Sequence, residues 1–359
     1  MLKMNGRRAF QVRHRLRFAG QMFCPPSAAI VGAYHYENVG DMALAAAGRQ
    51  QYFSALGTSS PNPALQTCAN IDAWPGRPRT YVCGGAILTE TFIQKLRKRF
   101  SDNAHLVALI GVEVARQGPD LSAESVAFLE KAPYVSLRNR AQLSATRLSE
   151  IADNVRTHPD IVFAFRHNER FVPVPNENSV AGVNIVGGAG YDNVRTEAES
   201  MAVRSAQRRF FRTFVENALD DGLKVVHVPF ALNDDMAARK MLDGLPVQFV
   251  PFSANPERVL RMVSGFSRFA PSRYHALIFG LLSDLPLSPF LYARKNYWLF
   301  EDFVGSEVPL GFREAMQGLS DAEIDTFAGR RYQIGPDTTD HLKAAAAAEL
   351  ETAFRSMQQ

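Results

Sequence analysis

An arginine and a histidine two positions apart begin one segment of the sequence and could together bind an anion and move a proton. They are Arg273 and His275 in SRYHALIFG, where Ser272 is the expected helix N-cap and the apolar residues that follow have helical spacing. A helix N-terminus carries a partial positive charge, so each basic side chain there costs about 0.3–1 kcal/mol unless an anion lies nearby. We therefore predict an anion-binding site with His275 as its titratable proton donor.

A second arginine stands where a predicted strand ends. Arg138 closes YVSLR, and side chains at the end of a parallel strand face the edge at which such sheets bind ligands. A guanidinium there is suited to hold a carboxylate or phosphate through two parallel hydrogen bonds. A salt bridge at the surface or between domains is the alternative interpretation.

Two glycine-containing turns are the remaining candidates. In HYENVGDMAL, Gly40 permits a sharp turn, Asp41 is placed to cap the following helix, and Asn38 can bond the loop backbone or a ligand. In CGGAIL, Gly84 and Gly85 end a predicted strand and let the backbone approach a ligand or a facing domain closely. Ordinary turn chemistry explains both segments equally well, and neither is the GxGxxG pattern of a dinucleotide site.

The elements that position these turns alternate short β-branched runs with longer amphipathic segments. This alternation is typical of parallel sheets wrapped by helices and predicts an α/β fold with two Rossmann-like doubly wound domains facing across a cleft. Helices are expected over residues 42–56, 90–100 and 197–219. Strands are expected at 28–34, 79–84, 105–111, 134–138, 181–188, 223–230, 247–252, near 266–270 and at 285–292.

The composition changes along the chain suggest four parts. Residues 1–27 form a basic N-terminal tail, 28–175 the first Rossmann-like domain, 176–318 the second, and 319–359 helices that pack across the domains. The polar, proline-containing stretch at 172–180 is the expected linker.

The charge distribution argues against a nucleic-acid partner. The chain carries a net charge of +4, but six positive charges between Lys3 and Arg17 stand in a stretch without a carboxylate, so the remainder has a net charge of −2. We interpret the tail as a disordered basic arm, an Arg-rich transit-like segment or a surface anchor for an anionic membrane, which would make the protein peripheral at the inner face of the membrane.

Cysteine and histidine usage argues against disulfides and metals. The three cysteines, Cys24, Cys68 and Cys83, have no CxxC spacing, and a reducing cytoplasm fits them best. His167 and His227 have no partner at metal-ligand spacing, so no metal site is predicted. No apolar run reaches the length of a membrane span.

Taken in order, the four turns resemble the polysaccharide pyruvyl transferase family, whose members are similar to two-domain glycosyltransferases of the GT-B type. The pattern is an N-x-G-D loop, a Gly-Gly strand end, an R-D-x-x-S segment and an R-x-H-A helix start. The chain departs from it at Asn139, Gln142 and Ala86, where the family often has Asp, Ser and a third glycine. The matching residues are Asn38 to Asp41, Gly84, Gly85, Arg138, Arg273 to Ala276, Pro286 and Tyr292 to Lys295.

The resemblance implies transfer of the pyruvyl group of phosphoenolpyruvate to sugar hydroxyls, without a further cofactor. The product would be a cyclic ketal on an exopolysaccharide, capsule or cell-wall glycan precursor, which can be lipid-linked. In this mechanism His275 is the acid and base, while Arg273 and Arg138 stabilise the departing phosphate and the carboxylate. The two glycine-containing turns and Lys295 would line the substrate site, with Asp41 as a second possible base.

Two other functions fit the same residues. A GT-B glycosyltransferase would hold the diphosphate of a nucleotide sugar in the same cradle and needs a carboxylate for the ribose, for which Glu301 is the candidate. A non-catalytic member of a polysaccharide assembly pathway is suggested by Asn139 and Gln142.

Overall fold

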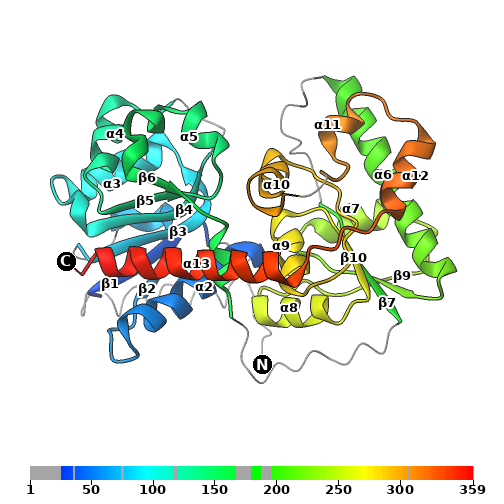
Figure 1. Ribbon diagram of the computed structural model, residues 1–359, viewed down its shortest axis with the longest axis horizontal. Coiled ribbons are helices and arrows are strands. Elements are labelled where there is room, and N and C mark those ends of the chain that lie inside the picture. The colour runs from blue at the N-terminus through cyan, green and yellow to red at the C-terminus, as the bar shows by residue number, and fades with distance from the viewer. Residues whose placement is uncertain are drawn as a thin grey trace, which may run out of the picture.

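The computed structural model of the protein contains two parallel β-sheets, and all strands of the first precede those of the second in the sequence (Figure 1). The structure describes residues 26–34, 37–73, 77–115, 120–166, 179–186, 194, 196–305 and 308–358. Most of the predicted linker, residues 172–178, and nearly all of the predicted basic tail lie outside these ranges, and the last linker residue, Val180, begins the second sheet. The fold class expected from the sequence, a GT-B-like pair of Rossmann-like α/β domains, is confirmed by the two sheets.

The first sheet has six strands in the order β2-β1-β3-β4-β5-β6, with every neighbouring pair parallel. Its apolar strands are buried on both faces, as helix-covered parallel sheets require. The order reverses between β1 and β3, so the loop after β1 lies at the point where doubly wound sheets bind ligands. The strands are β1 Ala28–Gly32, β2 Ala64–Thr67, β3 Arg79–Leu88, β4 Val107–Val114, β5 Tyr134–Leu137 and β6 Val155–Thr157.

The second sheet has four parallel strands in the order β10-β7-β8-β9. Read from its other edge this is the 3-2-1-4 order of a Rossmann fold, and the reversal falls between β7 and β10. The segment after β10, which carries Arg273 and His275, therefore lies at the switch point of this domain. The strands are β7 Val180–Asn184, β8 Lys224–His227, β9 Val247–Phe249 and β10 Arg268–Pro271.

Helices connect the strands, and sequence signals account for their ends. Helix α6 begins at a capping box in which Thr196 and Glu199 satisfy each other's backbone N–H groups, and α8 begins at the Asn255 cap followed by a proline. The α-helices are α2 Val39–Leu56, α3 Glu90–Phe100, α4 Ala123–Glu130, α5 Ala141–Ala145, α6 Glu197–Asp220, α7 Asp234–Met241, α8 Pro256–Ser264, α9 Tyr274–Leu282, α10 Arg294–Leu299, α11 Phe312–Ala315, α12 Asp321–Gly329 and α13 Pro336–Ser356. Shorter helical turns are η1 Cys68–Ala73, η2 Ala104–Leu106, η3 Arg147–Asn154, η4 Ile161–Ala164 and the π-helical η5 Phe300–Val304.

The last two helices pack on different domains. Helix α12 packs on α6 of the second domain, whereas α13 returns to the first domain and lies along α2 and η4 (Figure 1). A buried contact fixes α13 there, because Tyr134 and His158 both reach the carboxylate of Glu349. The chain end thus ties the two domains together.

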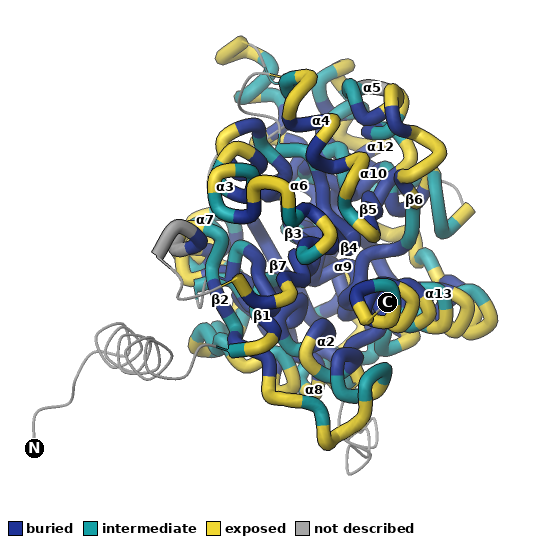
Figure 2. Tube along the Cα trace, turned by 90° about the vertical axis from the view of Figure 1, so that its left-hand side faces the viewer, coloured by how far each residue is buried: buried dark blue, intermediate teal, exposed yellow. Residues whose placement is uncertain are grey.

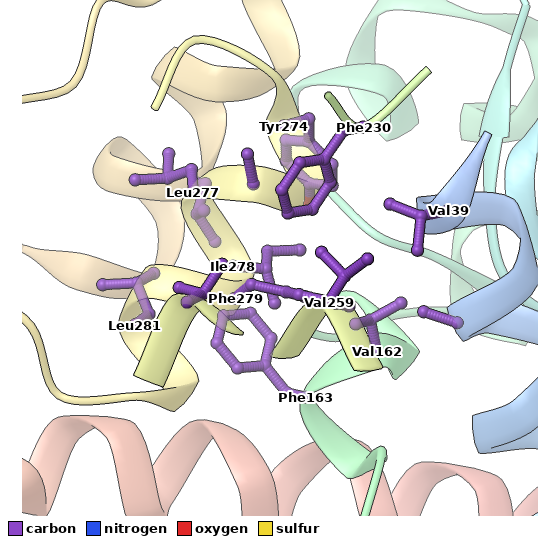
Figure 3. Packing of buried hydrophobic residues seen from close by; sticks show 14 of the residues in the cluster. Val39, Val162, Phe163, Phe230, Val259, Tyr274, Leu277, Ile278, Phe279 and Leu281 are labelled. Carbon is purple, nitrogen blue, oxygen red and sulfur yellow. The ribbon is translucent and has the colours of Figure 1, made fainter. Parts of the chain in front are cut away.

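An apolar core runs continuously from one domain into the other. In Figure 2 the buried segments of β3, β4, β7 and α9 lie in the interior, while α13 shows exposed stretches on the outside. At the junction, Val39 of α2 and Val162 and Phe163 of η4 face Ile278 and Phe279 of α9 (Figure 3). This shared core fixes the first turn of α2 close to the first turn of α9.

One strand prediction was wrong, and two strands were not predicted. Residues 285–292 make isolated bridges through Leu287 and Leu291 and form no continuous strand. The strands without a prediction, β2 and β6, have four and three residues, too few for a clear alternation of buried and exposed side chains.

Candidate functional site

Backbone pairing joins the domains where the first turn begins. Asn38 forms an antiparallel bridge with Ala231, and the Val39 N–H donates to the Phe230 carbonyl at 2.9 Å. Asn38 is also the N-cap of α2, since its side-chain oxygen accepts from the Gly40 N–H at 2.9 Å. The prediction that Asp41 is the cap was wrong. Asp41 lies in the first turn with its carboxylate uncommitted to capping.

Gly40 brings the first turn of α2 against His275. A Cβ placed on Gly40 would lie 1.9 Å from Nδ1 of His275, closer than any side chain tolerates. The sequence analysis explained Gly40 by a sharp turn. That reason was wrong, because Gly40 lies inside α2. The absence of a side chain at Gly40 is what lets the imidazole of the second domain pack on the first.

Arg138 is committed to carboxylates of its own domain. Its Nε and Nη2 donate to Glu113 at the end of β4, and its Nη1 donates to Asp160 beyond β6 at 2.9 Å. All three side chains are buried, and the guanidinium lies 4.9 Å from the ring centre of Tyr274. The expectation that this guanidinium faces a ligand was therefore incorrect. It forms a buried ion-pair network.

His275 lies beside this network in a neutral state. Its Nε2 is 3.8 Å from the Asp160 carboxylate and, among the described residues, has no hydrogen-bond partner. Burial lowers the pKa of His275, and the nearby Arg138 lowers it further, although Asp160 opposes both. The imidazole is thus uncharged at neutral pH, and the prediction of a histidine that donates a proton near pH 7 needs revision.

Arg273 is held by Asp234, which begins α7. Its Nε and Nη2 donate to the two carboxylate oxygens at 2.7 and 2.6 Å, and Asp234 also accepts from the N–H groups of Phe230 and Ala231. The arginine is therefore linked to the strand segment that pairs with Asn38. Its Nη1 makes no hydrogen bond in the part of the chain that the structure describes, and 17% of its side chain is exposed.

The start of α9 differs from the sequence expectation. Ser272 is not the N-cap, because its hydroxyl accepts instead from the Val186 N–H at 2.7 Å. Arg273 occupies the cap position without a side-chain cap, and its own N–H donates to the side chain of Asn184 at 3.0 Å. Asn184, at the end of β7, thus anchors the helix start from the neighbouring strand.

Asp41, Arg273 and Lys295 form the partly exposed part of the site, which we term the outer layer. Glu113, Arg138, Asp160 and His275 form the buried inner layer. Among the described residues Asp41 has no hydrogen-bond partner. Lys295 Nζ makes no hydrogen bond or ion pair with them and lies 5.5 and 5.8 Å from the ring centres of Tyr274 and Tyr292.

The outer layer contains an unusual carboxyl group. Burial raises the pKa of Asp41 to about 7, although Lys295, Arg138 and Arg273 favour its charged form. A carboxyl group with this pKa holds a proton half of the time at neutral pH. Asp41 therefore has the titration behaviour that the sequence analysis assigned to His275.

Gly84 and Gly85 lie within β3 and do not end it. Both have positive φ angles, 67° and 90°, and the pairing of β3 with β4 shifts register just after them. A Cβ on Gly84 would lie 2.4 Å from the Leu44 side chain of α2. The close approach predicted for Gly84 is thus made to α2 of the same domain.

The two polar departures from the family pattern have structural roles. Asn139 accepts from the Gln142 N–H at 3.1 Å, and the Gln142 side chain pairs with both backbone groups of Val114 at the end of β4. These bonds fix the turn that follows Arg138.

Sequence reasoning missed the anionic half of the site: Glu113, Asp160 and Asp234. Glu113 carried a recognisable signal, a carboxylate inside the apolar run VALIGVEV, where an unpaired charge would be costly. Asn184 carried a similar signal within the apolar run around β7. Asp160 and Asp234 resemble ordinary helix-start residues, and only the fold shows which arginines they face.

No group of three His, Cys, Asp or Glu side chains in the described residues is arranged to hold a metal ion. No helix in the described part of the chain has the length and apolar character needed to cross a bilayer.

No protein-family model and no curated protein matches this sequence. Solved structures with a similar course of the chain include UDP-GlcNAc 2-epimerase from Neisseria meningitidis, at 10% identity and a TM-score of 0.48, covering 91% of this chain and 99% of that one. Another is α,α-trehalose 6-phosphate synthase from Burkholderia multivorans, at 12% identity and a TM-score of 0.42, covering 87% and 75%. A Klebsiella pneumoniae protein of uncharacterised function has 12% identity and a TM-score of 0.40 over 84% and 94%. Similarities at this level bear on neither substrate nor reaction.

Proposed function

We propose that this protein is a transferase that moves the pyruvyl group of phosphoenolpyruvate onto sugar hydroxyls to form a ketal on a glycan precursor. One observation carries the proposal. Asn38 and Asp41 of the first domain lie in a single interdomain site with Arg273, His275 and Lys295 of the second. These residues belong to the motif segments that resemble the pyruvyl transferase family, and they are far apart in the sequence.

The outer layer would bind the donor. Phosphoenolpyruvate carries a carboxylate and a phosphate, and the outer layer offers one cation without a carboxylate partner, Lys295 Nζ, together with Nη1 of Arg273, the nitrogen of that guanidinium that Asp234 leaves unoccupied. Arg138 would act indirectly, because Glu113 and Asp160 occupy its hydrogen-bonding edges. We assign it the positioning of Asp160 and Tyr274.

Asp41 and His275 would handle the protons. Protonated Asp41 donates to the methylene carbon of the enol, and a sugar hydroxyl attacks the adjacent carbon while losing its proton to the neutral imidazole of His275. The C–O bond to phosphate then breaks, the departing phosphate takes the proton from His275, and a second hydroxyl closes the ketal as its proton passes to the carboxylate of Asp41. This reverses the priority of the sequence analysis, which placed the acid on His275.

The test is an incubation of the protein with phosphoenolpyruvate and a panel of sugar acceptors, with phosphate release and the mass of the acceptor as readouts. We expect phosphate release that depends on the acceptor and is lost in His275→Ala. The exposed carboxylate variant Asp153→Asn serves as the control that retains activity. Cellular function that survives His275→Ala would instead favour the non-catalytic assembly role.

Glycosyl transfer from a nucleotide sugar is the second candidate. It is favoured by the 3-2-1-4 strand order of the second sheet, which is a nucleotide-binding arrangement in Rossmann folds. Its expected ribose carboxylate, Glu301, accepts from Arg313 at 2.9 Å in a half-exposed pair that a ligand can displace. Binding of a nucleoside diphosphate without binding of phosphoenolpyruvate would establish this candidate over pyruvyl transfer.

A further inference from the structure

Lys295 lies beside two tyrosine rings in the outer layer. Its Nζ is 5.5 Å from the ring centre of Tyr274 and 5.8 Å from that of Tyr292. Both distances fall within the range of about 6 Å at which the face of an aromatic ring attracts a cation. No hydrogen bond or ion pair joins Nζ to a described residue. In the part of the chain that the structure describes, ring faces therefore hold this ammonium group in place of a carboxylate.

A ring face and a carboxylate hold a cation in different ways. A carboxylate accepts the N–H donors and neutralises the charge, as Asp234 does for Arg273. A ring face attracts the cation through its quadrupole and accepts no conventional hydrogen bond from it. An ammonium group that is oriented by rings thus keeps its charge and its N–H donors for an anionic ligand.

The ring of Tyr274 is held by several contacts. The residue is 3% exposed and belongs to the apolar core that the two domains share (Figure 3). The guanidinium of Arg138 lies 4.9 Å from its ring centre, and the ring of His275 meets it edge-on at 5.3 Å. A side chain packed in this way keeps one orientation. Tyr274 therefore presents a fixed ring to Lys295.

A hydrogen bond also fixes the backbone from which Lys295 extends. Lys295 lies in the first turn of α10 beside the buried Asn296, whose Nδ2 donates to the Ser272 carbonyl at 3.2 Å. Ser272 comes two residues before Tyr274, so this bond ties the start of α10 to the start of α9. Tyr292 stands three residues before Lys295 in the same segment. Lys295 and both rings are thus positioned together.

We propose that Tyr274 and Tyr292 are positioning residues of the donor site, whose rings orient the Lys295 ammonium group toward an anionic group of the donor. This inference rests on the proposed function. The rings act through Lys295, so their hydroxyl groups are not required. A lysine side chain that is already oriented loses less rotamer freedom when a ligand binds, and the affinity for the donor rises accordingly.

Calorimetric titration with phosphoenolpyruvate tests the rings. We expect about fivefold weaker binding by Tyr274→Leu and by Tyr292→Leu, and nearly unchanged binding by Tyr274→Phe and Tyr292→Phe, which keep the rings. Phe327→Leu is the matched control, because it removes a partly exposed ring that lies 4.8 Å from the Arg330 guanidinium at the end of α12. This control should bind as the wild type does. Losses in the phenylalanine variants as large as those in the leucine variants would overturn the assignment to the rings.

A double-mutant cycle tests whether the rings act through Lys295. In the Lys295→Met background, Tyr292→Leu should weaken binding no further, whereas a general structural defect would weaken it in both backgrounds and would overturn the inference. Tyr292 is partly exposed, so this comparison holds even if Tyr274→Leu does not fold.

The titrations separate failure of the inference from failure of the proposed function. Saturable binding by the wild type with equal affinity in the leucine variants would overturn the positioning role and leave the donor site standing. Absence of binding by the wild type would overturn the proposed function, and the positioning role with it.

Discussion

Two carboxylates of the interdomain site, Asp41 in the outer layer and Asp160 in the inner layer, have pKa values shifted in opposite directions. Burial raises the pKa of Asp41 to about 7, and no hydrogen bond among the described residues compensates it. Burial would also raise the pKa of Asp160, but Arg138 and the Val162 N–H, which each donate a hydrogen bond to one of its oxygens, hold that pKa well below its ordinary value. The difference arises from partners and not from burial alone.

This contrast separates charges that are fixed by a partner from charges that can respond to a ligand. In the inner layer the Asp160 carboxylate and the Arg138 guanidinium neutralise each other, so these charges are stable and fixed. In the outer layer Asp41 and Lys295 lack such partners and can respond to a substrate. Pairs of titratable groups with divergent pKa values are typical of acid–base sites.

The largest expected effect is on activity when the outer carboxyl is removed. Asp41→Asn should lower the rate of ketal formation by about 10²–10⁴-fold, because the proton donor is lost. Acceptor-dependent phosphate release measures it, and Asp153→Asn is the matched control. A variant with wild-type activity would show that Asp41 is not the acid.

Removal of the inner cation should mainly affect stability. Arg138→Met leaves Glu113 and Asp160 as uncompensated buried charges and should lower the free energy of unfolding by about 3–5 kcal/mol. Urea denaturation measures the change. The control Arg355→Met breaks an exposed pair with Glu351 and should cost at most about 0.5 kcal/mol. Equal losses in both variants would contradict the assignment of a buried, paired network.

A smaller effect is expected where the two layers meet. Gly40→Ala forces the new methyl group onto His275, so the free energy of unfolding should fall by about 1–3 kcal/mol. Gly329→Ala at the end of α12 meets no atom within 4 Å and should be neutral or slightly stabilising. If thermal unfolding shows no difference between these two variants, the imidazole does not pack on α2 as described.

The smallest effect is a pH dependence of opposite sign for the two carboxylates. Because the folded pKa of Asp41 is raised to about 7, its contribution to the free energy of unfolding falls as the pH rises from about 4 to about 7. Asp41→Asn should remove this pH dependence. We expect it to amount to about 1 kcal/mol of unfolding free energy, because solvent screens the partly exposed side chain. Asp160 has a lowered pKa, so its contribution is present above about pH 4 and is lost as the pH falls further. Denaturation of Asp41→Asn and Asp160→Asn across this range measures both slopes, and slopes of the same sign would contradict the comparison.

The sequence predicted the fold and half of the site for physical reasons. Apolar runs such as that of β4 and amphipathic segments such as α3 have the periodicities of their elements, so the α/β architecture was predictable. The positions of Asn38, Arg138 and Arg273 followed from the rule that ligands bind where parallel strands end.

The other half of the site could not be predicted, because it depends on contacts between segments that are distant in the sequence. Nothing local shows that Asp160 faces Arg138 or that Asp234 faces Arg273, and these pairs decide which cations remain available. Capping was also ambiguous, because Asn38 and Asp41 are both good cap residues and only the backbone geometry distinguishes them.

The most direct test of the outer layer as the donor site is calorimetric titration of the protein with phosphoenolpyruvate. We predict saturable binding by the wild type and by Arg355→Met, and at least about tenfold weaker binding by Lys295→Met, which loses a cation without a carboxylate partner. Equal affinity in Lys295→Met, or no binding of phosphoenolpyruvate by the wild type, would contradict the account.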